Sequence, residues 1–358
     1  MKSSLSRRNF LRSASVLGAA SLLSACMPGT DSLNSQESGT LRYLKILSTN
    51  DEHGWLEQGS DYGGADSLMY RWVRLEKIQD NPSRCLILSG GDLYTGPALS
   101  TWFKGESTID VMNAMGYQAA AIGNHDFDYG LANLRARAEQ AAFPLLSANI
   151  RRKDDGKVPE FIQPYIVKEV NGIKIGLIGL TTCETPVDTK PAHVGSLDFL
   201  HYETALLEIA PQVRQAGADL ILVVGHLCTS ELRSLAPLAR QLEIPILFGG
   251  HCHEVTNETV EGVALVQSGS FWRGYTRVEL LFDTEAKRVA RLELSFHYNE
   301  PGKVDMALSD QIATWRSRSD SALWQKIGYV RQKISNRSVG MARLLGRGRD
   351  HGPARCGR

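Results

Sequence analysis

Polar side chains able to bind metals or move protons follow five separate apolar stretches of the sequence. They lie in the segments NDEHG, SGGDLYTG, GNHDFD, VVGHL and GGHCH, and they are Asp51, His53, Asp92, Asn124, His125, Asp128, His226, His251 and His253. A single histidine after an apolar run is more often structural, and a single aspartate there often caps a helix. Buried together without a cation, however, the whole set would leave charges and lone pairs unmatched. Two divalent metal ions would satisfy it, and imidazole with carboxylate and amide oxygens suits Mn²⁺, Zn²⁺ or Fe²⁺.

The apolar stretches before these side chains are predicted strands, and they alternate with helical patterns from Leu41 onward. YLKILSTND, CLILSGGD, DLILVVGHL and IPILFGGHCH read as strands, whereas residues 66–78 carry apolar side chains at helical spacing. Open α/β sheets bind their ligands at the carboxyl ends of strands. We therefore expect an α/β fold whose polar clusters share one rim. Because an extended strand end presents alternate residues on one face, Asp51 and His53 are expected side by side.

Hairpins make the predicted sheets mixed rather than purely parallel. The Asn171–Gly172 dipeptide inside YIVKEVNGIKIGLIGL is the expected tight turn between two strands. Residues 260–297 read as antiparallel strands, and residues 309–334 as an amphipathic helix.

In their order along the chain, the motifs D-E-H, G-G-D, G-N-H-D, G-H and G-H-C-H resemble those of the dinuclear calcineurin-like metallophosphoesterases. LKILSTNDEHGWL and YQAAAIGNHDFD are similar to the two signature segments of the 5′-nucleotidase branch. The resemblance covers roughly residues 41–299. It implies a four-layer α/β/β/α sandwich with mixed sheets and a centre of two divalent metal ions at the strand ends.

The resemblance also implies a role for each polar residue. Metal ligands would be Asp51, His53, Asp92 and His253 for the first ion, and Asn124, His226 and His251 for the second, with Asp92 bridging the two. His125, oriented by Asp128, would form a catalytic dyad that stabilises or protonates the leaving oxygen, while the metals activate the attacking water. His253 stands where the 5′-nucleotidase/UDP-sugar hydrolases can carry a glutamine, so the resemblance extends to cyclic-nucleotide phosphodiesterases and thiosulfate-releasing hydrolases.

The predicted function is hydrolysis of extracytoplasmic 5′-nucleotides or related phosphoesters. The alternatives are a hydrolase of the same fold acting on a cyclic nucleotide, a UDP-sugar or a thiosulfate-type sulfur ester, and a truncated lipid-anchored protein with little turnover. Nucleotidases of this type carry a second domain that stacks the base. Here residues 41–300 form the predicted catalytic domain, residues 301–338 a helical linker, and residues 339–358 a basic tail, so we expect a truncated chain. Aromatic surface near the site, or ordinary core, is expected from Tyr62, Trp102, Phe271, Trp272 and Tyr275.

The N-terminus reads as an export signal. Arg7 and Arg8 precede a short apolar stretch that is too short to span a bilayer, which is typical of a twin-arginine signal peptide over residues 1–25. Residues 23–26 resemble a bacterial lipobox, which implies a lipid on Cys26 and a polar tether over residues 26–40. The predicted location is therefore the periplasm or cell surface, attached to a membrane by the lipid.

Composition adds few constraints. The 358 residues carry a formal net charge of +1, which gives no reason to expect nucleic-acid binding. The six cysteines show no paired spacing, so no disulfide framework is predicted, and Cys252 is expected to point into packing. Glycines beside the polar clusters are expected to keep the rim open to substrate; they are Gly90, Gly91, Gly123 and Gly250.

Overall fold

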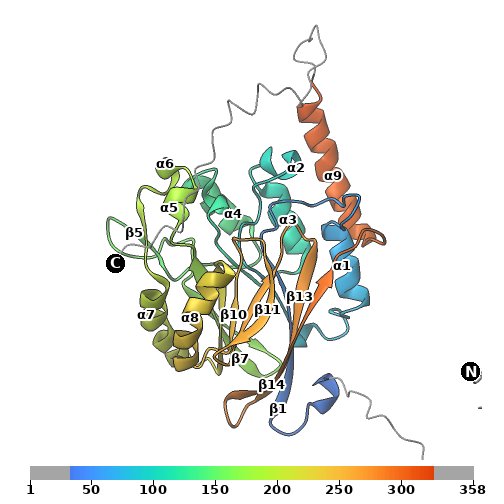
Figure 1. Cartoon of the computed structure of the whole chain (residues 1–358). Helices are drawn as coiled ribbons and strands as arrows, with labels where there is room; N and C mark the ends of the chain where they lie inside the picture. Colours follow the sequence, from blue (N-terminus) through green and yellow to red (C-terminus); the bar gives the residue numbers. More distant parts are fainter. Residues whose placement is uncertain (1–32, 326–358) are drawn as a thin grey trace, which may run out of the picture.

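The computed structural model describes residues 33–325, which form two six-stranded sheets packed face to face (Figure 1). The first sheet has the order β14-β13-β1-β2-β3-β4. Its strands are β1 (Leu41–Thr49), β2 (Cys85–Ser89), β3 (Ala119–Ala121), β4 (Leu145–Leu146), β13 (Gly274–Asp283) and β14 (Arg288–Tyr298). β1 to β4 are parallel, and β13 joins them antiparallel to β1, so the sheet is mixed as predicted.

The second sheet has the order β11-β12-β10-β9-β7-β6. Its strands are β6 (Tyr165–Val170), β7 (Ile173–Thr181), β9 (Leu220–His226), β10 (Ile246–Phe248), β11 (Val255–Val260) and β12 (Val263–Ser268). The predicted hairpin at Asn171–Gly172 joins β6 to β7. The prediction for residues 260–297 is partly wrong: β12 pairs antiparallel with β11 but parallel with β10, and the chain then crosses to the first sheet as β13.

Helices cover the outer face of each sheet, which completes the four-layer sandwich (Figure 1). The larger helices are α1 (Ala65–Arg74), α3 (Glu106–Met115), α4 (Leu131–Gln140), α7 (Tyr202–Gln215), α8 (Thr229–Gln241) and α9 (Met306–Leu323). Shorter elements are α2 (Ala98–Thr101), α5 (Thr185–Asp188), α6 (Pro191–Val194), η2 (Leu33–Gln36), η3 (Pro82–Arg84), η4 (His125–Phe127), β5 (Ile150–Arg152) and β8 (Leu197–Phe199).

The central strands β2, β3, β9 and β10 are buried along their whole length on both faces. In β9, Leu222 and Val224 pack between the two sheets, whereas Ile221 and Val223 pack under α7 and α8. Period-two alternation therefore separates two cores rather than core from solvent. The polar residues that follow such strands lie at the carboxyl edge of both sheets.

Segments near both ends of the described chain pack against the domain. Leu33, within the predicted tether, is buried with Tyr43 and Leu281. α9 buries Ile312 and Trp315, and the Trp315 indole donates to the Asp110 carboxylate at 2.8 Å. This helix ends at Leu323, before the predicted limit. The predicted signal peptide, Cys26 and the basic tail lie outside the described residues. No helix between residues 33 and 325 is long and apolar enough to cross a membrane.

Candidate metal centre

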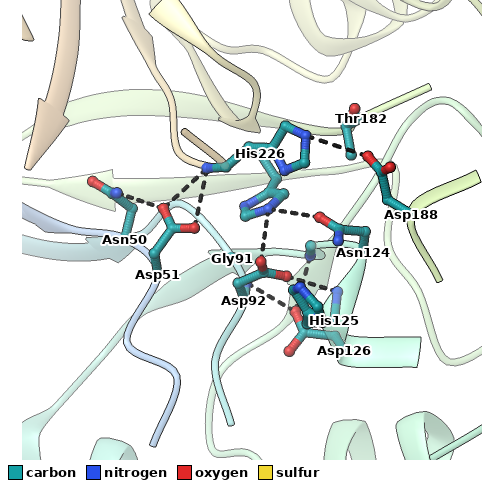
Figure 2. A network of polar contacts seen from close by, with 12 residues as sticks. Asn50, Asp51, Gly91, Asp92, Asn124, His125, Asp126, Thr182, Asp188 and His226 are labelled. Carbon is teal, nitrogen blue, oxygen red and sulfur yellow. Dashed lines mark hydrogen bonds and ion pairs between the residues drawn. The ribbon is translucent and has the colours of Figure 1, made fainter. Parts of the chain in front are cut away.

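All five polar segments meet at one edge, where the carboxyl ends of β1, β2 and β3 face those of β9 and β10. Figure 2 shows residues of four of them, among them Asp51, Asp92 and His226. A pocket of about 580 Å³ opens there. Its lining residues are His53, Trp55, Asp92, Thr95, Gly96, Asn124, His125, Asp188, His251, His253 and Phe271. The prediction of a shared rim is therefore confirmed for the five clusters.

The backbone that presents these side chains is not extended. Asp51 and His53 follow the end of β1 with φ angles of 51° and 48°. Asp92 has φ 58°, and His251 and His253 have φ 75° and 55°. The expectation of an extended strand end is thus wrong, although Asp51 and His53 do contribute donor atoms to one group. Non-glycine residues in the left-handed region cost about 1–3 kcal/mol each, and such strain concentrates at functional sites.

One group of donor atoms is formed by Asp51, His53 and His253, which lie within 4.8 Å of one another. The His53 Nδ1 lies 2.7 Å from the Thr95 carbonyl oxygen, which places the ring proton on that nitrogen. Its Nε2 then offers a lone pair, 3.2 Å from the Nε2 of His253. The Asp51 carboxylate oxygen Oδ1 lies 3.3 Å from the same His253 Nε2. These nitrogen and oxygen acceptors are the kind of ligands that bind a divalent cation.

A second group contains Asp51, Asp92 and His226, again within 4.8 Å. The His226 Nδ1 lies 2.8 Å from the Gly90 carbonyl, and its Nε2 lies 3.1 Å from both Asp92 Oδ2 and Asn124 Oδ1. Burial alone would lower the pKa of His226, but Asp92 and Asp51 raise it to about 10. The same negative charge would favour a divalent cation, which would take the place of the proton on His226.

Asp92 lies between the two groups. Its Oδ2 is 3.1 Å from the His226 Nε2 and 3.7 Å from the His53 Nε2, while its Oδ1 accepts the His125 backbone N–H at 2.8 Å. A carboxylate that faces ligands of both groups is suited to join two cations. The donor set therefore fits two divalent ions.

His251 lies in the pocket, with its ring centroid 5.1 Å from that of His226. Its backbone N–H donates to the Asp51 carboxylate at 3.0 Å, and its Nε2 lies 3.7 Å from Asp188 Oδ2. Its ligand atom groups with those of Glu184 and Asp188, rather than with Asp92 and His226. Asp188 is a pocket residue that the sequence analysis missed.

His125 and Asp128 form a hydrogen-bonded pair at the pocket. The His125 Nδ1 lies 2.9 Å from Asp128 Oδ2, and the Thr189 hydroxyl donates to the other carboxylate oxygen at 3.2 Å. The hydrogen bond to Asp128 raises the pKa of His125 to about 9. Because Nδ1 is engaged, Nε2 is the ring nitrogen left for a substrate.

Two further residues brace the ligand loops, and the sequence analysis missed both. Asn50 donates its amide to Asp51 Oδ2 and to the Gly269 carbonyl, each at 2.6 Å. Asp126 accepts backbone N–H groups from Asp92, Leu93 and Gly123 at 2.9–3.2 Å. Both stand inside the motifs NDEHG and GNHDFD, so their place beside a ligand was the available signal (Figure 2).

The glycines serve the packing of ligand loops rather than an open rim. A Cβ on Gly123 would lie 2.1 Å from Asp92 Oδ1, and one on Gly90 would lie 2.4 Å from the Gly249 carbonyl oxygen. Both contacts are far too short, so these loops approach closely only because no side chain intervenes. The expectation that they keep the rim open to substrate is corrected accordingly.

Cys228 and Cys252 form a disulfide, with their Cα atoms 5.1 Å apart. Cys228 follows His226 after β9, and Cys252 lies between His251 and His253 after β10. The prediction that Cys252 points into packing, with no legible disulfide, is therefore wrong. Sequence spacing gave no sign of it because 24 positions separate two cysteines that parallel neighbouring strands bring together.

The aromatic candidates divide between site and core. Phe271 lines the pocket, as does Trp55. The ring centroid of Tyr62 lies 5.8 Å from that of Trp55. Trp272 and Tyr275 are buried in the core, as the alternative expected. Trp102 is exposed and does not line the pocket.

Comparison with known proteins agrees with this geometry. Residues 44–255 match the family described as Calcineurin-like phosphoesterase. The chain belongs to this family. A 5′-nucleotidase of Vibrio cholerae is 37% identical over 267 residues, which cover 71% of this chain and 47% of that protein. The chain thus spans about half the length of this curated relative.

Solved structures share the fold. A 5′-nucleotidase precursor from Thermus thermophilus has a TM-score of 0.68 at 22% identity, over 80% of this chain and 60% of that one. The calcineurin-like phosphoesterase YfkN from Bacillus subtilis has a TM-score of 0.69 at 21% identity, over 80% of this chain and 100% of that one. At such identities the likeness establishes the mixed four-layer architecture.

Proposed function

We propose that the chain is a metal-dependent phosphohydrolase that acts on 5′-nucleotides or related phosphoesters. The observation that carries the proposal is a pair of donor groups, joined by Asp51 and Asp92, beside a pocket that His125 also lines with its hydrogen-bonded partner Asp128 behind it. Membership of the phosphoesterase family supports hydrolysis of a phosphoester. Relatives named 5′-nucleotidase support the narrower choice of substrate.

The proposed ligands are those expected from the sequence. Asp51, His53, Asp92 and His253 would hold the first ion, and Asp92, Asn124, His226 and His251 the second. When bound, two such ions supply a water of lowered pKa and neutralise charge on the phosphoryl group. The backbone carbonyls of Thr95 and Gly90 keep His53 and His226 in the tautomer that offers Nε2 as a ligand.

His125 supplies the proton for the leaving oxygen. With Nδ1 bound to Asp128, the protonated ring presents its Nε2–H to the pocket. General-acid catalysis of this kind contributes about 10²–10⁴-fold to rate. Asp128 fixes the tautomer and the ring orientation, and Thr189 holds Asp128.

We also propose export by the twin-arginine route and attachment to a membrane through a lipid on Cys26. The support is the arginine pair Arg7–Arg8 and the lipobox-like residues 23–26. Mass spectrometry of the protein from membranes of the producing cell tests it: an unmodified N-terminus would contradict the anchor.

The activity is tested by phosphate release from AMP with Mn²⁺, with chelator, and in Asp92→Asn. We expect metal-dependent turnover that the chelator removes. Mutation of a residue that only supports metal ligands typically lowers activity by roughly 10- to 100-fold. Because Asp92 is a proposed ligand, Asp92→Asn should lower turnover by more than that. The exposed Asp154 provides a matched control, Asp154→Asn, which should retain wild-type turnover. Turnover of only a cyclic nucleotide, a UDP-sugar or a sulfur ester, or none from metal-loaded folded protein, would overturn the proposal.

A further inference from the structure

The pocket has an aromatic side that the proposed ligands and the His125–Asp128 pair do not use. Trp55 and Phe271 line the pocket together with Thr95 and Gly96. The volume of about 580 Å³ lies within the range typical of small-molecule sites. A phosphate held at the metal ligands would fill only one end of it.

Three side chains form an aromatic wall, Phe271–Trp55–Tyr62, that begins at the metal ligands. The Phe271 ring centroid lies 5.1 Å from that of His253 and 5.5 Å from that of His53. Trp55 follows at 5.0 Å from Phe271, and Tyr62 at 5.8 Å from Trp55. The leaving group of a phosphoester held at the metal ligands would therefore meet these rings.

The turn that carries Phe271 has an unusual backbone. Phe271 and Trp272 have φ angles of 61° and 51°, in the left-handed region that bulky residues rarely adopt. The Phe271 N–H donates to the Asp51 carbonyl at 2.8 Å, while the buried Trp272 indole donates to the Tyr117 hydroxyl at 2.9 Å. Trp272 thus anchors the turn in the core, and Phe271 is held at the pocket.

Arg273 contacts two of the three rings of the wall. Its guanidinium lies 4.8 Å from the Tyr62 ring centroid and 5.5 Å from that of Phe271. Cation–π contacts of this kind contribute about 0.5–1 kcal/mol each at exposed sites. Arg273 therefore favours the observed arrangement of Tyr62 and Phe271.

Ordinary core packing accounts for Trp272 and Tyr275, but not for Trp55 and Phe271. Those two are only partly buried and line an open pocket. Exposed, preordered aromatic faces next to a phosphate site favour a planar ring, because stacking is available to every nucleobase.

We propose that Trp55 and Phe271 bind the base of a nucleoside 5′-monophosphate whose phosphate lies at the metal ligands. This inference rests on the proposed function and specifies that the leaving group of the phosphoester substrate is a nucleoside. Water oxygen bonds to phosphorus and gives up a proton to solvent, while the bond from phosphorus to the ribose 5′-oxygen breaks and His125 donates its proton to that oxygen. His125 then regains a proton from solvent. The products are a nucleoside and inorganic phosphate.

The experiment compares AMP with ribose 5-phosphate, which has the same sugar phosphate without the base. We expect Trp55→Ala and Phe271→Ala to lower the ratio of kcat/KM for AMP over ribose 5-phosphate by about 5- to 150-fold. Trp55→Phe, which keeps a ring, should retain most of the ratio. Trp102→Ala, at an exposed tryptophan outside the pocket lining, should leave the ratio at its wild-type value.

Equilibrium dialysis with labelled adenosine gives a second readout that needs no turnover, and circular dichroism checks that each variant is folded. Adenosine should bind the metal-loaded wild type, and Trp55→Ala should weaken that binding. Wild-type turnover of both substrates with an unchanged ratio in the variants overturns the inference alone. If neither substrate is turned over, the proposed function is overturned. If, in addition, adenosine does not bind, or binds equally well to Trp55→Ala, the inference is overturned too.

Discussion

The imidazole of His125 and the carboxylate of Asp128 are joined by a hydrogen bond of 2.9 Å between Nδ1 and Oδ2. This contact is the first cause of the raised pKa of His125, about 9. A group with that pKa is protonated at neutral pH, which an acid for the leaving oxygen must be. The turn of η4 places Asp128 beside His125, and this contact keeps on the ring the proton that the reaction requires.

Asp128→Asn should shift the pH dependence of kcat. Without the anionic acceptor the pKa of His125 falls, so the ring loses its proton at lower pH and the alkaline limb moves to lower pH. At a pH near 8, kcat should decrease, by at most the roughly 10²–10⁴-fold that general-acid catalysis contributes. Asp198→Asn, at an exposed aspartate, is the control. An alkaline limb that stays where it is in the wild type would contradict the role of Asp128.

Thr189→Val should lower kcat with little change in KM. The Thr189 hydroxyl donates to Asp128 Oδ1 at 3.2 Å, and hydrogen bonds to charged groups contribute about 1.5–3 kcal/mol. Loss of this contact lets Asp128 move and should cost about 10-fold or more in kcat. Thr189→Ser keeps the hydroxyl and should restore most of the rate. If both variants behave alike, Thr189 acts through packing rather than through this hydrogen bond.

Apolar runs followed by polar clusters predicted the strands, the mixed sheets and the shared rim. The reason is physical: strands buried on both faces are largely apolar, so the polar clusters of the site stand where β1, β2, β3, β9 and β10 end. The order of the sheets was beyond reach, because β12 is apolar enough to pair with β10 or with β13, and only the packed structure decides.

The details of the site depend on contacts that spacing does not encode. The left-handed conformations of Asp51 and His53 arise because their N–H groups donate to the Gly91 and Asp92 carbonyls, far along the chain. The disulfide partner of Cys252 is set by the neighbouring strand. The bracing roles of Asn50 and Asp126 require knowing which backbone groups come near, so the motifs could only place them beside ligands.

Removal of the Cys228–Cys252 disulfide should weaken both the fold and metal binding. The bond joins the segments that carry His226, His251 and His253, and closing a loop of this length typically contributes about 2–4 kcal/mol. We expect Cys228→Ser/Cys252→Ser to lower the free energy of unfolding by that amount and to raise the Mn²⁺ dissociation constant. Reductant should reproduce the loss in the wild type and have no effect on the double variant. Equal sensitivity of both proteins to reductant would show that another group is responsible.

Asp126→Asn tests whether the carboxylate behind the ligand loops sets their geometry. Asp126 accepts the backbone N–H groups of Asp92, Leu93 and Gly123, and a buried donor left without its acceptor costs about 1–3 kcal/mol. An asparagine has one acceptor oxygen, and its amide N–H group would face another donor. We therefore expect a lower free energy of unfolding by about that amount and a Mn²⁺ affinity reduced by about 10- to 100-fold, measured by chemical denaturation and calorimetry. The exposed Asp154→Asn control should change neither quantity. Loss of stability with undiminished metal affinity would show that Asp126 supports the fold without positioning Asp92.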